Sequence, residues 1–461
     1  MTDEMIAEPD LRDDDQPGLD NWRVDAIRAA IEAEDAARLN ELIEPLYAAD
    51  IADLLEQISG GERRAFLRLS AREIDGDVLS ELDESIREEV IEALPHDVLA
   101  EAVRELDSDD VVDILEDLEE PQQEIILGAL EDADRVAVQQ AMAYPEYSAG
   151  RLMQRETVTA PEDWTVGQTI DHLRSIDWLP DQFYHVILVD PKMRPIGNVT
   201  LGRILSAKRA TKLREICEEV FFTIKATEEE KEVAYLFNQY HLISMPVVDE
   251  ADRLVGVITI DDAMNVLDEE HEEDILRLAG VGEGSLSDNW IETTKQRFPW
   301  LFVNLLTAIL ASGAISLFEG TISKIVALAV LMPIVASQGG NAATQGLAVA
   351  VRALATKSLT RSNALRVIWR EIAQGVANGV MFAVIMGIIA YFWFGQPMIG
   401  VVIGMAMVIN MFAAALAGLL IPLGLEKMGF DPALASGAFV TTVTDVVGFF
   451  SFLWLAGMIL L

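Results

Sequence analysis

Five long apolar stretches fill residues 299–461, and they constrain the fold of this chain more than any other feature. A helix needs about 20 apolar residues to cross roughly 30 Å of hydrocarbon, and every stretch is long enough. Inside lipid the backbone polar groups must be paired within the protein, which favours helices. The sequence therefore predicts a five-helix transmembrane domain over residues 291–461, with spans near residues 299–317, 323–350, 372–394, 397–424 and 433–460.

Basic residues predict how these spans are oriented, because cytoplasmic loops carry an excess of Lys and Arg. The connections at Phe318–Thr321 and Phe394–Pro397 contain no base. Bases instead precede the first span and separate the second from the third: Lys295, Arg297, Arg352, Lys357, Arg361, Arg366 and Arg370. We therefore predict a multi-pass protein of the cell membrane, with a cytoplasmic amino terminus and an outside carboxyl terminus.

The two halves of the chain differ in charge. The formal net charge is −42, and residues 291–461 carry nine bases and six acids, which leaves −45 on residues 1–290. Phosphate contacts need a positive surface, so this excess argues against nucleic acid as a partner and favours a cation. A generally acidic, salt-adapted surface would produce the same composition without a specific ligand.

Residues 150–270 contain an internal repeat. Val186–Leu205 aligns without a gap with Met245–Met264, a shift of 59 residues. Each copy reads as two apolar strands around a turn, followed by a helix. The pattern resembles an α/β CBS-domain pair, with copies at residues 146–209 and 210–267. The first copy has Arg203 and lacks the acid after Thr200 that nucleotide-binding CBS units place on ribose, which argues against ATP binding.

Two acidic helical segments flank the repeat. After an acidic tail at residues 1–21, predicted to be disordered, residues 22–145 show apolar positions at helical spacing, which predicts an all-α superhelical domain. Residues 268–290 follow the CBS pair and predict an acidic connecting helix. Like charges about 4 Å apart repel by roughly 4 kcal/mol at an effective dielectric near 20, so this helix is a candidate cation sensor. It would need no such role if its acids form only a solvated face.

Polar residues within the apolar stretches point to a cation path. Asp445 lies in the last stretch, and a carboxylate at membrane depth costs roughly 2.5–3.5 kcal/mol, so it is usually kept for transport. Asn341 and Gln345, four residues apart, place two amides on one face of the second helix. Mg²⁺ prefers near-octahedral oxygen ligands and keeps several waters. The spans contain no cluster of histidines or thiolates, which argues against a soft transition metal.

The order of these segments resembles the MgtE family of magnesium channels and transporters over nearly the whole chain. The resemblance rests on the GGN sequence at Gly339–Asn341, followed by Gln345, and on DPALAS through TTVTD at Asp431–Asp445. It implies a multi-domain integral membrane protein: a superhelical amino domain, a CBS pair, an acidic connecting (plug) helix and five transmembrane helices. It also implies a homodimer in membrane lipid, an ion path between the protomers, and closure when cytosolic Mg²⁺ is plentiful.

Site residues follow from the same resemblance. Asp445 matches the pore carboxylate, Gly437 and Thr441 match contributors of backbone carbonyls, and Asn341 falls in the signature of the second span. The implied sensing carboxylates are Asp77, Asp109 and Asp113 of the amino domain, Asp262 of the second CBS copy, and Glu270, Glu273 and Asp274 of the connecting helix. Two departures are Ala343, where the signature has glycine, and Ala438, where a proline often follows Gly437.

Two other functions remain open. An ion-coupled divalent cation exchanger would require flux to depend on a second ion gradient, and no further acid in the spans visibly provides for one. A membrane-anchored Mg²⁺ sensor without transport could lose Asp445 with no effect on flux. The five histidines are scattered and none lies in a nucleophile motif, so we do not expect an enzyme.

Overall fold

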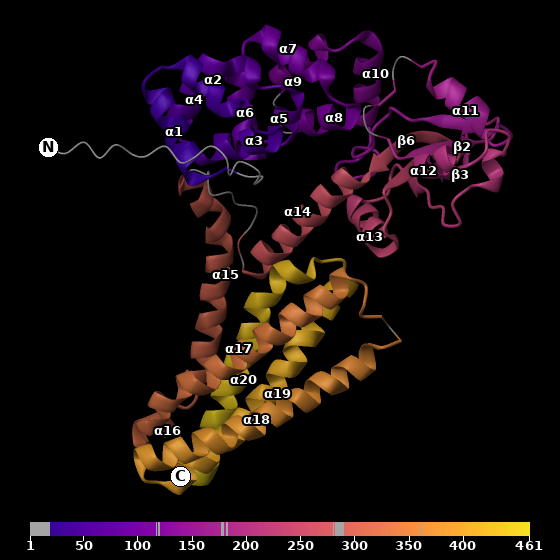
Figure 1. Cartoon of the computed structure of the whole chain (residues 1–461). Helices are drawn as coiled ribbons and strands as arrows, with labels where there is room; N and C mark the ends of the chain where they lie inside the picture. Colours follow the sequence, from indigo (N-terminus) through magenta and orange to yellow (C-terminus); the bar gives the residue numbers. More distant parts are fainter. Residues whose placement is uncertain are drawn as a thin grey trace. The chain divides into compact units, whose positions relative to one another are not determined.

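The computed structural model describes residues 19–116, 118, 120–176, 179–180, 183–279, 281, 290–360 and 362–461. It divides into two compact units, Met1–Leu267 and Asp268–Leu461, and each is described by itself (Figure 1). Most of the predicted tail, residues 1–18, lies outside the described residues, as does Arg361. Residues 280 and 282–289 of the predicted connecting segment also lie outside them.

The first unit begins with short helices that pack in sequence around one apolar core. They are α1 (Asn21–Glu32), α2 (Ala36–Ile43), α3 (Ala48–Gln57), α4 (Gly60–Ser70), the 3₁₀ turn η1 (Ala71–Glu73), α5 (Gly76–Ser80), α6 (Glu84–Ala93), α7 (His96–Glu105), α8 (Ser108–Glu116), α9 (Glu120–Ala129) and α10 (Asp132–Ala141). Side-chain caps start several of them. Ser59 and Glu62 form a capping box at α4, in which Glu62 Oε2 accepts from Ser59 N at 2.7 Å.

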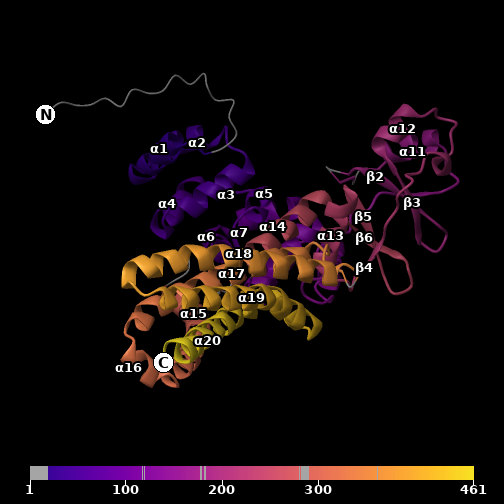
Figure 2. The ribbon, with the colours of Figure 1, turned by 90° about the horizontal axis from the view of Figure 1, so that it is seen from below.

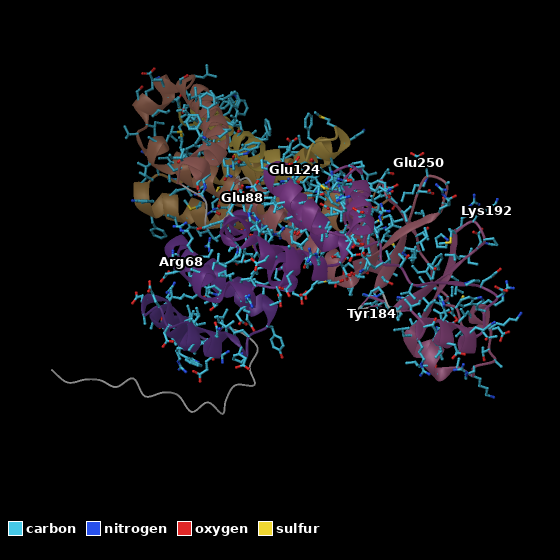
Figure 3. All side chains as sticks on the ribbon, turned by 90° about the horizontal axis from the view of Figure 1, so that it is seen from above. Arg68, Glu88, Glu124, Tyr184, Lys192 and Glu250 are labelled. Atoms are coloured by element: carbon cyan, nitrogen blue, oxygen red, sulfur yellow. The ribbon has the colours of Figure 1, made fainter. Side chains whose placement is uncertain are left out.

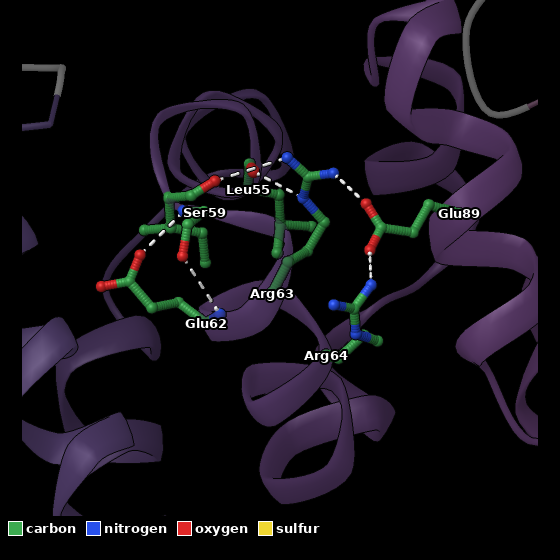
Figure 4. A network of polar contacts seen from close by, with 7 residues as sticks. Leu55, Ser59, Glu62, Arg63, Arg64 and Glu89 are labelled. Atoms are coloured by element: carbon green, nitrogen blue, oxygen red, sulfur yellow. Dashed lines mark hydrogen bonds and ion pairs between the residues drawn. The ribbon is translucent and has the colours of Figure 1, made fainter. Parts of the chain in front are cut away.

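Buried arginines tie alternate helices together. Arg63 of α4 donates to Leu55 O at 2.9 Å and pairs with Glu89 of α6 at 2.5 Å (Figure 4). Arg87 of α6 donates to Leu82 O at 3.2 Å and pairs with Asp113 of α8 at 2.8 Å. A buried guanidinium must keep its partner, because an uncompensated buried charge costs several kcal/mol. The same ion pair therefore recurs along the superhelix.

The two CBS copies have the same sheet topology. The first sheet contains β1 (Thr159–Pro161), β2 (His185–Val189) and β3 (Pro195–Thr200), and the second contains β4 (Ile224–Lys225), β5 (Ser244–Val248) and β6 (Leu254–Thr259). In each sheet the first pair of strands is parallel and the second antiparallel. The bounds of β5 and β6 follow those of β2 and β3 by 59 residues, as the sequence repeat predicted. Lys192 and Glu250 mark the two hairpin turns (Figure 3).

Helices cover these sheets and lead into the second unit. They are α11 (Val166–Leu173), α12 (Leu201–Ser206), the 3₁₀ turn η2 (Leu213–Glu215), α13 (Glu230–Tyr240) and α14 (Ile260–Leu278). The second unit continues with α15 (Trp290–Ser316), α16 (Glu319–Lys324), α17 (Ala327–Ala355), α18 (Ala364–Phe394), α19 (Pro397–Lys427) and α20 (Pro432–Leu460). The last four run side by side (Figures 1 and 2).

Glycines allow the closest helix contacts in this bundle. A Cβ at Gly400 of α19 would lie 2.6 Å from Gly387 O of α18, so neither helix can carry a larger residue there without moving. Helix α18 ends at Gly395, whose φ of 67° suits glycine, and Pro397 then begins α19. Helices α18 and α19 are therefore antiparallel neighbours joined by a short connection.

Four described helices are long and apolar enough to cross a membrane: Thr293–Ser316, Ala364–Phe394, Pro397–Lys427 and Gly437–Leu460. Helix α17 has 29 residues, but the polar sequence SQGGNAATQG in its middle lowers its mean hydropathy. It packs against both α19 and α20, and many of its residues are buried. The chain thus has several membrane-spanning apolar helices, and the predicted count of five stays a prediction.

Candidate functional site

The GGN sequence of α17 lies against the helix that carries Asp445. A side chain at Gly339 would overlap the amide of Asn410 in α19, and a Cβ at Gly340 would lie 4.0 Å from Thr444 Oγ1 in α20. Asn341 directly follows Gly340, and Asp445 directly follows Thr444. The structure therefore brings α17 and α20 together next to Asn341 and Asp445, two of the five predicted path residues.

The predicted path residues keep polar groups at the surface of the bundle. Asn341 and Gln345 are exposed, and Asp445 is half-buried. No hydrogen bond or ion pair engages the Asp445 carboxylate within the described part of the chain. The Thr441 hydroxyl donates to Gly437 O at 2.9 Å, so this carbonyl already accepts a side-chain hydrogen bond.

Asn410 is a residue of this site that sequence reasoning missed. It is 1% exposed, and its Nδ2 donates to Val335 O of α17 at 2.8 Å. A Cβ at Gly448, three residues after Asp445, would lie 2.8 Å from the same nitrogen. Its Oδ1 is buried and has no hydrogen-bond partner among the described residues. Asn410 is thus the point at which α17, α19 and α20 meet. The sequence signal that could have identified Asn410 is a single amide side chain within an apolar stretch.

The end of α14 contacts the beginning of α20. Arg277 pairs with Glu273 and, at 2.6 Å, with Asp431, whose other oxygen caps α20 by accepting from Ala433 N at 2.7 Å. Leu278 packs against a cluster that includes Ala343 of α17. Of the predicted sensing acids on this helix, Glu273 is therefore engaged with a base. Glu270 and Asp274 lie half-buried on the same helix and also have partners.

A second group of acids lies where α8 meets the second CBS copy. Burial, and then the charge of Asp262, raise the pKa of Asp109 well above its usual range. The same two causes raise the pKa of Asp110 to about 7. Burial also raises the pKa of Asp262 to about 7, although Thr259 Oγ1 donates to its Oδ2 at 2.8 Å. Predicted residues Asp109 and Asp262 thus come together, with Asp110 as a member that was not predicted.

The remaining predicted acids lie elsewhere. Asp113 pairs with Arg87 and takes the position that Glu89 has in the preceding ion pair along the superhelix. Asp77 lines a separate pocket with Asp75 and Glu105. Among the described residues, no group of three or more His, Cys, Asp or Glu side chains is arranged to hold a metal ion. The assignment of metal ligands therefore stays a prediction.

Three domain families match successive segments of the chain. The MgtE intracellular N domain matches residues 46–147, CBS domains match residues 149–210 and 213–269, and the divalent cation transporter domain MgtE matches residues 332–455. The magnesium transporter MgtE of Thermus thermophilus is 30% identical over 441 residues, which cover 94% of this chain and 98% of that protein. This chain belongs to the MgtE family of magnesium transporters.

Two further comparisons involve MgtE proteins. The magnesium transporter MgtE of Enterococcus faecalis is 32% identical over 321 residues, which cover 70% of this chain and 71% of that protein. A solved structure of the cytosolic domain of the Mg²⁺ channel MgtE in complex with ATP is 29% identical, covers 53% of this chain and 99% of that one, and has a TM-score of 0.48. These relatives are named magnesium transporters and not enzymes, as the sequence predicted. The residues that match the divalent cation transporter domain include Asn341, Asn410 and Asp445.

The acids of this MgtE chain predict a pH-dependent contact at α8. An unfolded Asp has a pKa of about 3.9, so between about pH 4 and pH 7 the folded protein binds more protons at Asp110 and Asp262 than the unfolded one. The free energy of unfolding therefore falls as pH rises through this window, by on the order of a few kcal/mol, since one pKa unit corresponds to about 1.4 kcal/mol. Mg²⁺ should restore the lost stability above pH 7.

Amide hydrogen exchange on the full-length protein checks this expectation. Protection factors of α8, corrected for intrinsic exchange, should be higher at pH 6 than at pH 8 without Mg²⁺ and should recover at pH 8 when Mg²⁺ is added. Asp110→Asn should reduce this pH dependence, whereas Asp132→Asn, at a side chain 93% exposed, should not. Equal protection at both pH values in the wild type would contradict the raised pKa values.

Proposed function

We propose that this chain forms a homodimeric Mg²⁺ channel for uptake across the cell membrane, with the ion path between the two copies and closure by cytosolic Mg²⁺. The observation that carries the proposal is the exposed pair Asn341 and Gln345, on a helix that packs beside Asp445. Polar groups at membrane depth usually face protein or water, because facing lipid is costly. A second copy across a twofold axis gives them that environment.

Two copies would line the path with two Asp445 carboxylates and several amide and carbonyl oxygens. Mg²⁺ dehydrates reluctantly and is usually held by one or two carboxylates while it keeps waters. The paired carboxylates would attract the cation, and the amides of Asn341 and Gln345 would hydrogen bond to its water shell. A largely hydrated Mg²⁺ is therefore the substrate that this set of groups fits.

Cytosolic Mg²⁺ closes the path through the acids of α8 and α14. Without the ion, Asp109, Asp110 and Asp262 are held close together, where burial, and then the charge of Asp262, raise the pKa of Asp109 and Asp110. Mg²⁺ bound between them, and at Glu270, Glu273 and Asp274, favours the compact arrangement. The Arg277–Asp431 ion pair provides a direct link from α14 to α20. Changing the ratio of closed to open molecules from 1:99 to 99:1 needs about 5.5 kcal/mol of differential Mg²⁺ binding, and several weak sites can contribute to this sum.

The cleft between the CBS copies is a poor site for ATP. Its lining residues are Gln154, Glu156, Val158, Phe183, Tyr184, His185, Ile187, Ser244, Val257 and Thr259. They include a carboxylate and no Lys or Arg, so a triphosphate would gain no charge-assisted contact from them. Arg203 of the first copy is engaged with Cys217 O at 2.7 Å. The proposed closure does not require ATP.

Flux into liposomes tests the proposal. The purified protein should admit Mg²⁺, and Mg²⁺ on the face of the soluble domain should inhibit that flux. Glu270→Gln with Glu273→Gln should raise the inhibitory Mg²⁺ concentration by about tenfold or more, equivalent to about 1.4 kcal/mol of lost coupling. The matched control is Asp268→Asn with Glu272→Gln, two exposed acids of the same helix, and it should keep the wild-type inhibition.

The same assay separates the alternatives. Dependence of flux on a second ion gradient would favour a coupled exchanger. Absence of flux in every condition, with Mg²⁺ binding retained, would favour a sensor without transport. Unchanged inhibition in Glu270→Gln with Glu273→Gln would remove these acids from the sensing mechanism.

A further inference from the structure

Helix α18 turns one face to α19, and no other described helix covers much of its opposite face. Gly375 and Gly379 lie on the packed face, where a Cβ at Gly375 would lie 2.6 Å from the Cβ of Ala415. In the apolar 18-residue segment that qualifies α18 as a membrane span, only 17% of the residues are buried. Large apolar side chains, including Val380, Val384 and Ile388, are exposed along it. These residues suit contact with lipid tails.

Exposed aromatic residues lie near both ends of α18. Trp369 is 69% exposed, and Phe392 and Trp393 are 80% and 60% exposed. At about 1.5 Å per residue, Trp369 and Phe392 are about 34 Å apart along the helix. This length matches the roughly 30 Å of hydrocarbon in a bilayer. Trp and Tyr concentrate at membrane–water interfaces, so the two groups mark where α18 enters and leaves the hydrocarbon.

The two ends differ in charge. Arg366 and Arg370 lie within one turn of Trp369, and Arg352 and Lys357 lie at the end of α17; all four are exposed. We call these four residues the basic collar. Glu371 is the only acid of the sequence between residues 320 and 425. Its side chain is 14% exposed and lies 3.7 Å from Arg370. Residues 388–400, at the other end of α18, contain no charged residue.

We propose that the basic collar binds the phosphate groups of anionic phospholipids, with Trp369 at the level of the headgroups. Juxtamembrane Lys and Arg attract anionic lipid, and Arg presents planar donors that match a phosphate. Residues 1–290 carry a charge of −45 and would be repelled by an anionic surface, so the attraction is expected at the bases that flank the spans, of which the collar is the largest described group.

The collar also has a consequence for the path, and this part rests on the proposed function. Arg352 lies in the last turn of α17, the helix that carries Gly339–Asn341, and Lys357 follows the end of this helix at Ala355. A headgroup held by α17 and α18 together fixes that end of α17 relative to its neighbours. Anionic lipid is therefore expected to increase Mg²⁺ flux.

Lipid binding is measured on the full-length protein by native mass spectrometry, with dioleoyl phosphatidylglycerol or phosphatidylcholine added in detergent. Each base contributes about a fivefold gain in affinity for anionic lipid, so Arg366→Gln with Arg370→Gln should bind phosphatidylglycerol about 25-fold more weakly. Lys324→Gln, at an exposed base of α16, should bind it as the wild type does. The preference over phosphatidylcholine should weaken at high salt.

Equal phosphatidylglycerol binding by the wild type and by Arg366→Gln with Arg370→Gln would overturn the collar as a lipid site. The double variant should remain folded by its thermal midpoint, and a modest fall in that midpoint would reflect the lost contact between Arg370 and the largely buried Glu371. Trp369→Leu, which keeps both bases, should lose less affinity than the double variant. Weaker lipid binding with unchanged flux would support the site and overturn its link to α17. Flux absent in every lipid would instead reject the proposed function and leave the binding result intact.

Discussion

Asp445→Asn should lower the initial rate of Mg²⁺ entry into liposomes by about tenfold or more, equivalent to at least about 1.4 kcal/mol in the barrier. Asp445 is the only acid of α20, and no base neutralises it among the described residues. Asn has nearly the same shape, so the helix contacts around Thr444 should persist. What is lost is the charge that attracts a divalent cation into an apolar region.

The control for this variant is Glu319→Gln, which removes the charge of an exposed acid in α16. Its flux should equal that of the wild type, and the thermal midpoints of both variants should stay close to the wild-type value. Full flux through Asp445→Asn would place the ion path elsewhere in the chain. A folded Asp445→Asn protein that still binds Mg²⁺ in its soluble half would show that transport and sensing use separate carboxylates.

Gly339→Ala should reduce both stability and flux. A methyl group there would overlap Asn410 Nδ2, so α17 and α19 must separate or the amide must leave Val335 O. Overpacking of this kind typically costs about 1–3 kcal/mol. The lost hydrogen bond would leave a buried amide with neither of its polar atoms paired. Scanning fluorimetry of the purified protein and Mg²⁺ uptake into liposomes measure the two effects.

Gly424→Ala is the matched control, because a Cβ at Gly424 of α19 would meet nothing within 4 Å. Replacing an unconstrained helical Gly with Ala is neutral or stabilises by roughly 0.5–1 kcal/mol. Asn410→Ala should relieve the overlap, so its combination with Gly339→Ala should be less destabilising than the sum of the two changes, with a coupling of about 0.5–3 kcal/mol. Additive effects would show that Gly339 and Asn410 do not touch.

The identity and order of the segments followed from the sequence alone. The 59-residue repeat predicted two matching strand hairpins, because alternating apolar residues and turns are local signals. The apolar stretches predicted the long helices, and the spacing of Asn341 and Gln345 predicted that both amides share one face of a helix. The family resemblance, carried by short motifs such as Gly339–Asn341, was confirmed by the comparisons.

Only the tertiary structure decided which side chains meet. Asp113 was a predicted cation ligand, yet it pairs with Arg87, whereas Asp110 lies beside Asp109 and Asp262. Asn410 bonds to Val335 across 75 residues of sequence, within a helix whose apolar pattern gives no direction for its amide. Periodicity shows which residues share a face of one helix, but the partner of that face is set by how distant helices pack.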